Sequence, residues 1–189
     1  MEKFKGLGND TAAEEKDDFT WEMPEVDSKQ KQETATVVKP MVGENGGMKA
    51  LAMYQPWASL LACGISQVEN CNWVTEERGT FLIAATNNKE VWDSLDPQIK
   101  GIYKHLEKQG ILPAYEELPT NAIIGYADLT SIVDRCNLPG TNRKYAYHFV
   151  IRNPHVFDEL ILNHTVGSKF YEVKEVTPEN MPASHQVKL

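Results

Sequence analysis

The spacing of hydrophobic and polar residues changes near residue 48 of the chain. Residues 1–47 are rich in Glu, Asp, Lys, Gln, Thr and Gly, and their isolated apolar residues never recur at a regular period. Such a segment cannot bury enough apolar surface to offset the entropy lost on ordering. We therefore expect a disordered acidic tail over residues 1–47, a folded domain over 48–176 and a flexible C-terminal tail over 177–189.

Short apolar runs predict β-strands within the domain. Residues 49–54 form one such run, and residues 78–86 form a nearly continuous one, which is typical of a strand buried on both faces. Residues 122–134 predict a longer strand, in which Gly125 marks a bulge or a close approach of another backbone. Further strands are expected at residues 145–152, 160–162 and 170–173.

Two segments predict helices. Gln55-Pro56-Trp57 opens the first, because a proline is tolerated in the first helical turn, and Trp57, Leu60 and Leu61 then share one face. Residues 89–109 carry apolar residues at helical spacing, with Pro97 dividing them into two pieces. Because strands outnumber helices and do not alternate with them, we expect an α+β fold, a mixed β-barrel with flanking helices.

The distribution of charge bears on the choice of partner. The net charge of −8 argues against attraction of nucleic acid by the chain as a whole. However, residues 1–47 hold 11 acidic and 6 basic side chains, whereas residues 48–189 hold 16 and 13. The domain is thus only mildly acidic and has room for a local basic face, and the acidic tail is a candidate contact for a basic protein partner.

Several classes of protein are disfavoured by the residues present. Cys63, Cys71 and Cys136 form no CxxC pair, and the five histidines show neither HxH nor HExxH spacing, so we expect no disulfide framework, metal or cofactor. No apolar run approaches the roughly 20 residues of a membrane span, and the first residues do not resemble a signal peptide. We therefore expect a cytoplasmic protein with no membrane partner.

Ordered motifs across the domain resemble the ASCH family. They begin with residues 51–61 (LAMYQPWASLL), residues 64–69 (GISQVE) and Trp73. The similarity continues through residues 78–79 (RG), 83–86 (IAAT), 118–125 (LPTNAIIG), 153–154 (NP) and 167–171 (GSKFY). The resemblance implies a PUA-like β-barrel with flanking helices and a cleft beside the loop after the first helix.

The resemblance also implies a class of ligand. ASCH domains are regarded as modules that bind RNA or other nucleic acids, and some bacterial members hydrolyse modified nucleosides such as acetylcytidine. The family signature after the first helix is Gly-x-Lys-x-x-Glu-x-Arg, but here Ser66 replaces the lysine and Cys71 the arginine. Both replacements remove a cation that would contact a phosphate or a carbonyl group.

The candidate cleft combines aromatic, acidic and amide side chains. Trp57 and Trp73 are candidates for stacking on bases, although either also suits a core or a cleft wall. Glu69 suits a general base, a contact to a base edge, or an ion pair with Arg78. The nucleic-acid- or ligand-binding cleft is expected to comprise Gln55, Trp57, Ser66, Glu69, Asn72, Trp73 and Arg78.

Some candidates in and around the cleft keep two interpretations. Gln55 suits contact with a base edge or a cap on the helix that follows it. Ser66 and Cys71 lack a neighbouring group that would activate a nucleophile, so no catalytic residue is assigned. The cations that suit phosphate contact, or simple solvation, are Lys49, Arg135, Arg143, Lys144 and Arg152.

The sequence therefore favours a small module that binds RNA or single-stranded nucleic acid. The alternatives are an amidohydrolase acting on a modified nucleoside such as acetylcytidine, and a non-enzymatic interaction or regulatory protein that works through its acidic tail. The absence of the two signature cations counts against binding and catalysis alike, and because Ser66 cannot replace the signature lysine we expect no hydrolysis of acetylcytidine.

Overall fold

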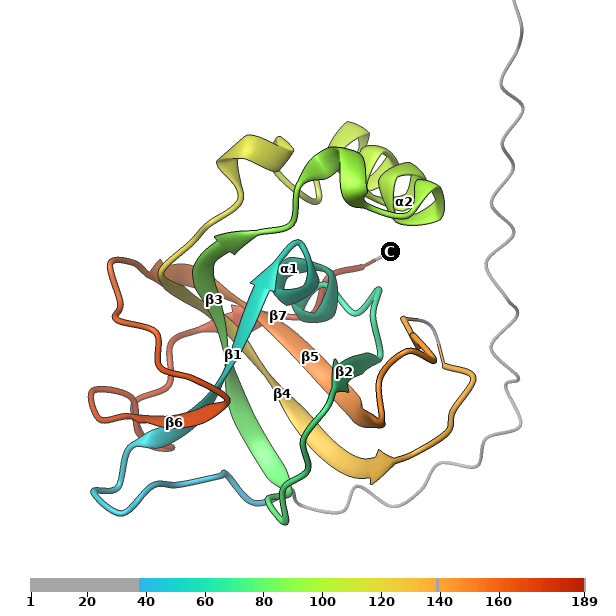
Figure 1. Cartoon of the computed structure of the whole chain (residues 1–189). Coiled ribbons are helices and arrows are strands. Elements are labelled where there is room, and N and C mark those ends of the chain that lie inside the picture. Colours follow the sequence, from blue (N-terminus) through green and yellow to red (C-terminus); the bar gives the residue numbers. More distant parts are fainter. Residues whose placement is uncertain (1–37, 139, 189) are drawn as a thin grey trace, which may run out of the picture. The chain divides into compact units, whose positions relative to one another are not determined.

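The computed structural model describes residues 38–138 and 140–188 (Figure 1). The part of the predicted tail from residue 1 to residue 37 lies outside these residues. In chain order the elements are β1 (Met48–Gln55), α1 (Trp57–Ala62), β2 (Val68–Cys71), β3 (Gly79–Lys89), the 3-10 helix η1 (Trp92–Ser94), α2 (Pro97–Lys108), the 3-10 helix η2 (Tyr115–Glu117), β4 (Ala122–Val133), β5 (Tyr147–Ile161), β6 (Phe170–Val173) and β7 (Ser184–His185).

The strands form one seven-stranded mixed sheet. Six strands follow the order β2-β5-β4-β3-β1-β6, and β7 pairs with β5 outside this path. The β1–β3 pair is parallel, with Leu51 opposite Ile83, and the other pairs are antiparallel. The predicted α+β class is confirmed. The sheet is open, since β2 and β6 are its two ends and do not pair with each other.

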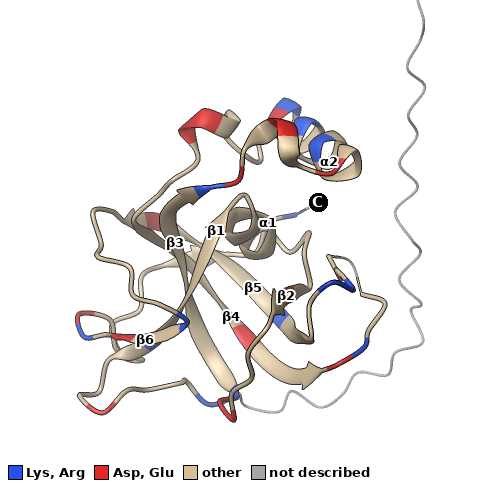
Figure 2. Ribbon diagram, viewed as in Figure 1, with Lys and Arg blue, Asp and Glu red and all other residues tan. Residues whose placement is uncertain are grey.

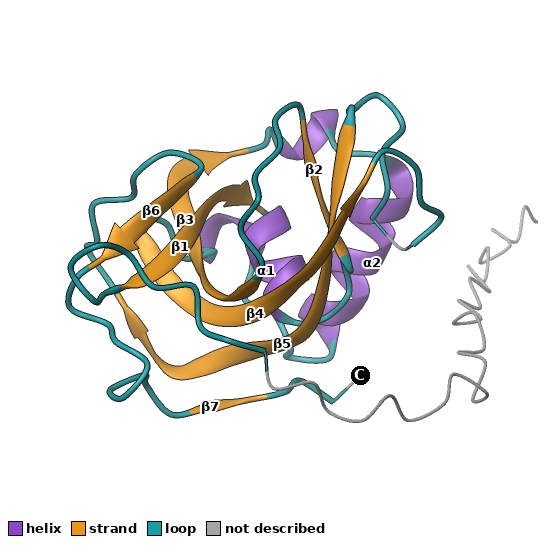
Figure 3. Ribbon diagram, turned by 90° about the horizontal axis from the view of Figure 1, so that it is seen from below, coloured by secondary structure: helices purple, strands orange, loops and turns teal. Residues whose placement is uncertain are grey.

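The helix α1 fills the concave side of this sheet (Figure 3). Its residues Ala58, Leu61 and Ala62 are buried in one cluster with side chains from β1, β3, β4 and β5, including Phe81 and Phe149. A helix of six residues is too short to be stable alone in water, so this burial is what maintains it. Gly64, with a φ of +80°, follows the helix and releases the chain toward β2.

The predicted division of residues 89–109 at Pro97 is confirmed. Pro97 is the first residue of α2, and the Asp96 side chain caps the helix by accepting a hydrogen bond of 2.8 Å from the Gln98 N–H. Tyr103 and Leu106 on the inner face of α2 are buried with Leu60 of α1. Within the described residues, no helix has the length and apolar content needed to span a membrane.

Strand β5 differs from its prediction. Residues 145–152 and 160–162 were expected to form separate strands. The structure joins them into one strand of 15 residues, and the register with β4 shifts between Tyr126 and Asp128, near this dipeptide. A proline is compatible with a strand at such an irregularity, where no ladder hydrogen bond is needed from it.

The domain extends beyond its predicted limits at both ends. The expected tail includes residues 38–47, yet the Met41 N–H donates to the Thr80 carbonyl at 2.8 Å, and the Met41 side chain is buried. In the expected C-terminal tail, Ser184–His185 pairs with β5. These segments are short and have no periodic pattern of their own, so their place in the fold depends on the sheet that accepts them.

Gly125 is confirmed as a position of close backbone approach. A Cβ atom there would overlap the carbonyl oxygen of His155 on the neighbouring strand β5. The register of β4 also shifts against β5 between Ile123 and Gly125. The absence of a side chain thus lets two long central strands stay paired through an irregularity.

The burial of α1 generates a stability prediction. Leu61→Ala removes a fully buried side chain from the centre of the concave face, and is expected to lower the free energy of unfolding by about 2 to 4 kcal/mol. Leu162→Ala is the matched control, since Leu162 is 61% exposed. Urea denaturation measures both changes, and similar free energies for the two variants would contradict the role assigned to α1.

Candidate functional site

A cavity of about 710 Å³ opens beside β2. Its walls come from β2, from the start of α1, from the segment around η1 and the start of α2, and from the loop that joins β4 to β5. We call it the β2 cleft, and its lining comprises Trp57, residues 68–70, Glu90, residues 94–96, residues 98–99 and residues 140–145. Residues 63–67, the loop after α1 where the cleft was expected, are not among the lining residues, which include the strand that follows this loop.

Glu69 is a half-buried residue of β2 that contributes a carboxyl group to this cleft. It lies in β2 opposite Phe149, and burial raises the pKa of its carboxyl group to about 8. Two residues further along the strand, burial also raises the pKa of the Cys71 thiol, with a smaller contribution from the nearby Glu69 charge. At neutral pH, Glu69 is therefore mostly protonated and can donate as well as accept a hydrogen bond.

The expected pairing of Glu69 with Arg78 does not form. Arg78 is exposed, and its guanidinium donates hydrogen bonds to the carbonyl oxygens of Thr75 at 3.1 Å and Glu77 at 2.6 Å. The described residues provide no ion-pair partner for Glu69. An unpaired carboxylate is costly to bury, which is consistent with a carboxyl group that keeps its proton.

Asn70 attaches the β4–β5 loop to the cleft. Its side-chain Nδ2 donates to the Gly140 carbonyl at 2.8 Å, and its Oδ1 accepts from the Asn142 N–H at 2.9 Å. The same Oδ1 lies 3.0 Å from Nδ1 of His148 on β5. One amide thus fixes the path of the loop that carries Arg143, Lys144 and Tyr145 into the cleft lining.

Gly140 of this loop lies close to Ser66, in the segment before β2. Gly140 has a φ of +91°, and a Cβ atom there would overlap the Ser66 hydroxyl oxygen. Ser66 is 8% exposed, and its hydroxyl donates to the Val68 carbonyl at 2.8 Å. The position at which the family signature has lysine is therefore covered by loop backbone and lacks space for a long side chain.

The predicted site residues take different places. Trp57 and Glu69 line the cleft, but Gln55 is fully buried and bridges α1 to the segment before β4. Its Oε1 accepts from the Ser59 N–H at 3.2 Å, and its Nε2 donates to the Pro119 carbonyl at 2.8 Å. Of the two interpretations of Gln55, the structure supports the helix cap, because both side-chain polar atoms are already bonded.

Asn72 and Trp73 lie outside the cleft lining. Asn72 is exposed, and its Oδ1 accepts from the Ala146 N–H at 3.2 Å, so it holds the far end of the loop that Asn70 also holds. Trp73 packs edge-on against Phe149, at a centroid distance of 4.9 Å, and against Phe170 at 6.0 Å. It therefore serves as packing at the border of the core.

The cations expected to contact phosphate divide into two groups. Lys49 is paired with Glu77, and the Arg152 guanidinium donates to the Ile151 carbonyl at 2.9 Å. The others lie on the β4–β5 loop, where Figure 2 shows basic positions, and these are Arg135, Arg143 and Lys144. Three of the five expected cations thus lie on one loop that borders both cavities.

The sequence interpretation missed Asn70 and Tyr145. Asparagine is depleted in strands, so its presence within β2 was the available signal for a special role. Tyr145 is 40% exposed and had no signal of its own, because its place in the cleft follows from the path of the β4–β5 loop that Asn70 holds. No group of three or more potential metal ligands occurs among the residues that the structure describes.

The raised pKa of Glu69 predicts a pH-dependent stability. In the folded protein the Glu69 carboxyl group has a pKa of about 8, whereas its ordinary pKa is 4.5. Between these two pH values the folded state therefore binds more protons than the unfolded state. The free energy of unfolding is therefore expected to decrease as the pH rises through this window. The decrease should be roughly 1 to 3 kcal/mol, less than the full pKa difference implies, because Glu69 is only half-buried and solvent screens its charge.

Glu69→Gln tests this prediction because glutamine has no proton to release. Urea denaturation at pH 5 and at pH 8 should show a smaller loss of stability in the variant than in the native protein. Glu76→Gln is the control, since Glu76 is exposed and does not line the cleft. An unchanged pH dependence in Glu69→Gln would contradict the assignment.

Comparison with known proteins gives a partial match. No protein-family model matches the chain. Activating signal cointegrator 1 from Mus musculus and its counterpart from Homo sapiens are each 35% identical to this chain over 88 residues. The match covers 46% of this chain and 14% of each relative, so this chain corresponds to a small part of those proteins. The resemblance to the ASCH family is confirmed by this homology to a protein that carries an ASCH domain.

Proposed function

We propose that the domain binds single-stranded nucleic acid, and RNA in particular, through the β2 cleft. The open, curved sheet is on this proposal the PUA-like barrel of the ASCH fold, with its ligand site beside the segment after α1. The observation that carries the proposal is the combination of side chains in one cavity. A protonated carboxyl group, two aromatic rings and two loop cations line the same 710 Å³ space.

Each of these groups suits one part of a nucleotide. Aromatic side chains such as Trp57 and Tyr145 stack on bases with little dependence on sequence. The protonated Glu69 both donates and accepts, which matches the mixed donors and acceptors at a base edge. Arg143 and Lys144 suit the phosphates of the strand.

The charge of the cleft suggests a modest electrostatic contribution. The lining also contains Glu90 and Asp96, whose negative charges offset the positive charges of Arg143 and Lys144. Glu69 is mostly uncharged at neutral pH. Few phosphates can be neutralised in such a site, and the slope of log affinity against log salt follows the number neutralised. We therefore expect stacking and hydrogen bonding to contribute more to the affinity than charge attraction does, and the affinity to change little with salt concentration.

A second candidate function is hydrolysis of a modified nucleoside such as acetylcytidine. The observation in its favour is the Glu69 pKa of about 8, since a carboxyl group that titrates near neutrality suits proton transfer. Against it, Ser66 is buried beneath Gly140 where the signature has lysine, and Cys71 stands where the signature has arginine. We expect no acetylcytidine hydrolysis above background by the native protein.

Tyr145→Ala tests the proposed binding site. Loss of one stacking ring is expected to weaken binding of a fluorescent single-stranded RNA by about 1 to 3 kcal/mol, which is about 5- to 150-fold in dissociation constant. Tyr54→Ala is the matched control, because Tyr54 is 50% exposed but lies outside the β2 cleft. Fluorescence anisotropy measures both variants.

Two results would contradict the proposal. Equal affinities for native protein and Tyr145→Ala would remove the β2 cleft as the binding site, and absence of RNA binding at low salt would remove the function. Release of cytidine from acetylcytidine, lost in Glu69→Gln, would instead establish the second candidate.

A further inference from the structure

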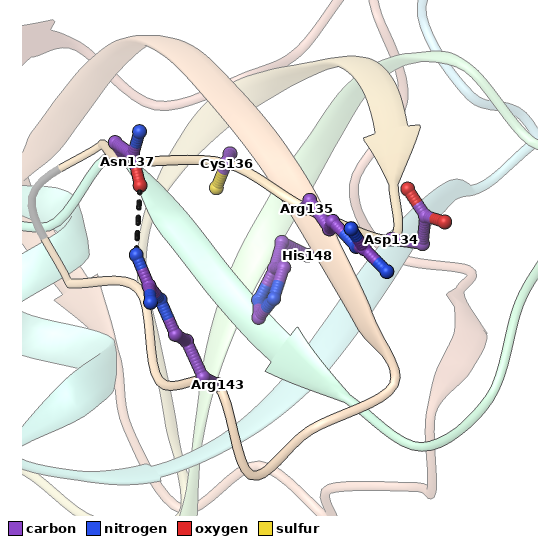
Figure 4. A pocket seen from close by; sticks show the side chains of 6 residues that line it. All are labelled: Asp134, Arg135, Cys136, Asn137, Arg143 and His148. Atoms are coloured by element: carbon purple, nitrogen blue, oxygen red, sulfur yellow. Dashed lines mark hydrogen bonds between the residues drawn. The ribbon is translucent and has the colours of Figure 1, made fainter.

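A second cavity, of about 530 Å³, lies on the other side of the β4–β5 loop (Figure 4). We call it the loop cavity, and its lining comprises Asp134, Arg135, Cys136, Asn137, Arg143 and His148. Two guanidinium groups thus approach one hollow in a chain whose net charge is −8. Among the described residues that line it, Asp134 alone has a carboxylate, so the lining carries more positive than negative charge.

His148 is the buried wall of the loop cavity. It is 2% exposed, and Figure 4 shows its ring between Arg135 and Arg143. Asn70 has a fixed amide orientation, because its Nδ2 donates to the Gly140 carbonyl and its Oδ1 accepts from the Asn142 N–H. His148 Nδ1 must therefore donate to that Oδ1, which leaves Nε2 without a partner among the described residues.

The two arginines retain most of their donor capacity. Arg143 Nη2 donates to the Asn137 Oδ1 at 3.3 Å, and the structure gives Arg135 no hydrogen-bond or ion-pair partner within residues 38–138 and 140–188. Asp134 forms no ion pair with either of them in that same part of the chain. A planar guanidinium with free N–H groups is well suited to bind the oxygens of a phosphate in pairs.

The loop cavity and the β2 cleft share a wall. Arg143 lines both cavities, and Asn70, which lines the β2 cleft, holds the His148 ring of the loop cavity. A ligand in the β2 cleft therefore lies one side chain away from the second hollow. Neighbouring sites of aromatic and of cationic character correspond to the base and the phosphate of one strand.

We propose that the loop cavity is a phosphate subsite, in which Arg135 and Arg143 bind a phosphodiester of the strand whose base enters the β2 cleft. This inference rests on the proposed function and makes it more specific, since the ligand must carry a phosphate next to the recognised base. A free nucleoside would leave the two arginines unused. The subsite thus favours a polynucleotide over a nucleoside as the ligand of this domain.

Arg135→Gln in the full chain is the test, because Arg135 lines the loop cavity alone. Binding of a fluorescent single-stranded RNA is measured over a range of salt concentrations for native protein, Arg135→Gln and Arg78→Gln. Arg78 is the matched control, since it is exposed, carries the same charge and lines neither cavity. We expect Arg135→Gln to weaken binding about five- to tenfold at low salt and to reduce the salt slope by about 0.7, with little change in Arg78→Gln.

The pattern over the variants separates the two proposals. Loss of affinity in Tyr145→Ala, together with an Arg135→Gln protein that matches Arg78→Gln, would overturn the phosphate subsite and keep the proposed function. Equal losses in both arginine variants would also overturn it, because they would report net charge rather than a site.

Inorganic phosphate provides a measurement that does not require RNA binding. The resonances of the His148 ring are followed by NMR as phosphate is added to the native protein and the two arginine variants. Shifts in the native protein and Arg78→Gln, absent in Arg135→Gln, would support an oxyanion site even if no RNA bound, with free phosphate as its ligand. Unchanged resonances in the native protein would overturn the subsite.

Discussion

The fold depends on the burial of the short helix α1 inside the curve of the sheet. Six helical residues cannot maintain themselves in water, and an open sheet cannot keep a concave apolar face exposed. The sheet therefore buries the apolar face of the helix, and the helix covers the apolar face of the sheet. Because α1 follows β1 directly and contributes Trp57, the contact that stabilises the core also fixes one wall of the candidate site.

The site itself depends on a smaller interaction, the amide of Asn70. Three polar groups converge on this side chain, two from the loop backbone and one from the ring of His148. The hydrogen bonds are part-buried or exposed individually, but they act on one loop that has few apolar contacts of its own. The loop can thus present cations to two cavities without contributing much to the core.

The sequence supplied more of the fold than of the site. Buried strands such as β3 and the break at Pro97 leave local signals, apolar continuity and a missing N–H group, and both were predicted from residues near one another in the chain. The joining of β5 through Asn153-Pro154 was missed because local turn propensity was outweighed by pairing with β4. Positions in the cleft depend on which strands pair, as Tyr145 and Asn70 illustrate, and no local pattern encodes that.

Because Gly140 lies against Ser66, a large side chain at position 66 and the present path of the loop cannot occur together. A long side chain at position 66 requires the loop to withdraw, and a side chain on residue 140 would overlap the Ser66 hydroxyl and strain a backbone whose φ is +91°. The space between these two positions can therefore be filled either by a lysine side chain at position 66 or by the cationic β4–β5 loop. Replacing a lysine at position 66 by the loop would transfer positive charge from the segment before β2 to the β4–β5 loop and leave the sheet unaltered. Ligand preference can therefore change in this architecture without a change of fold.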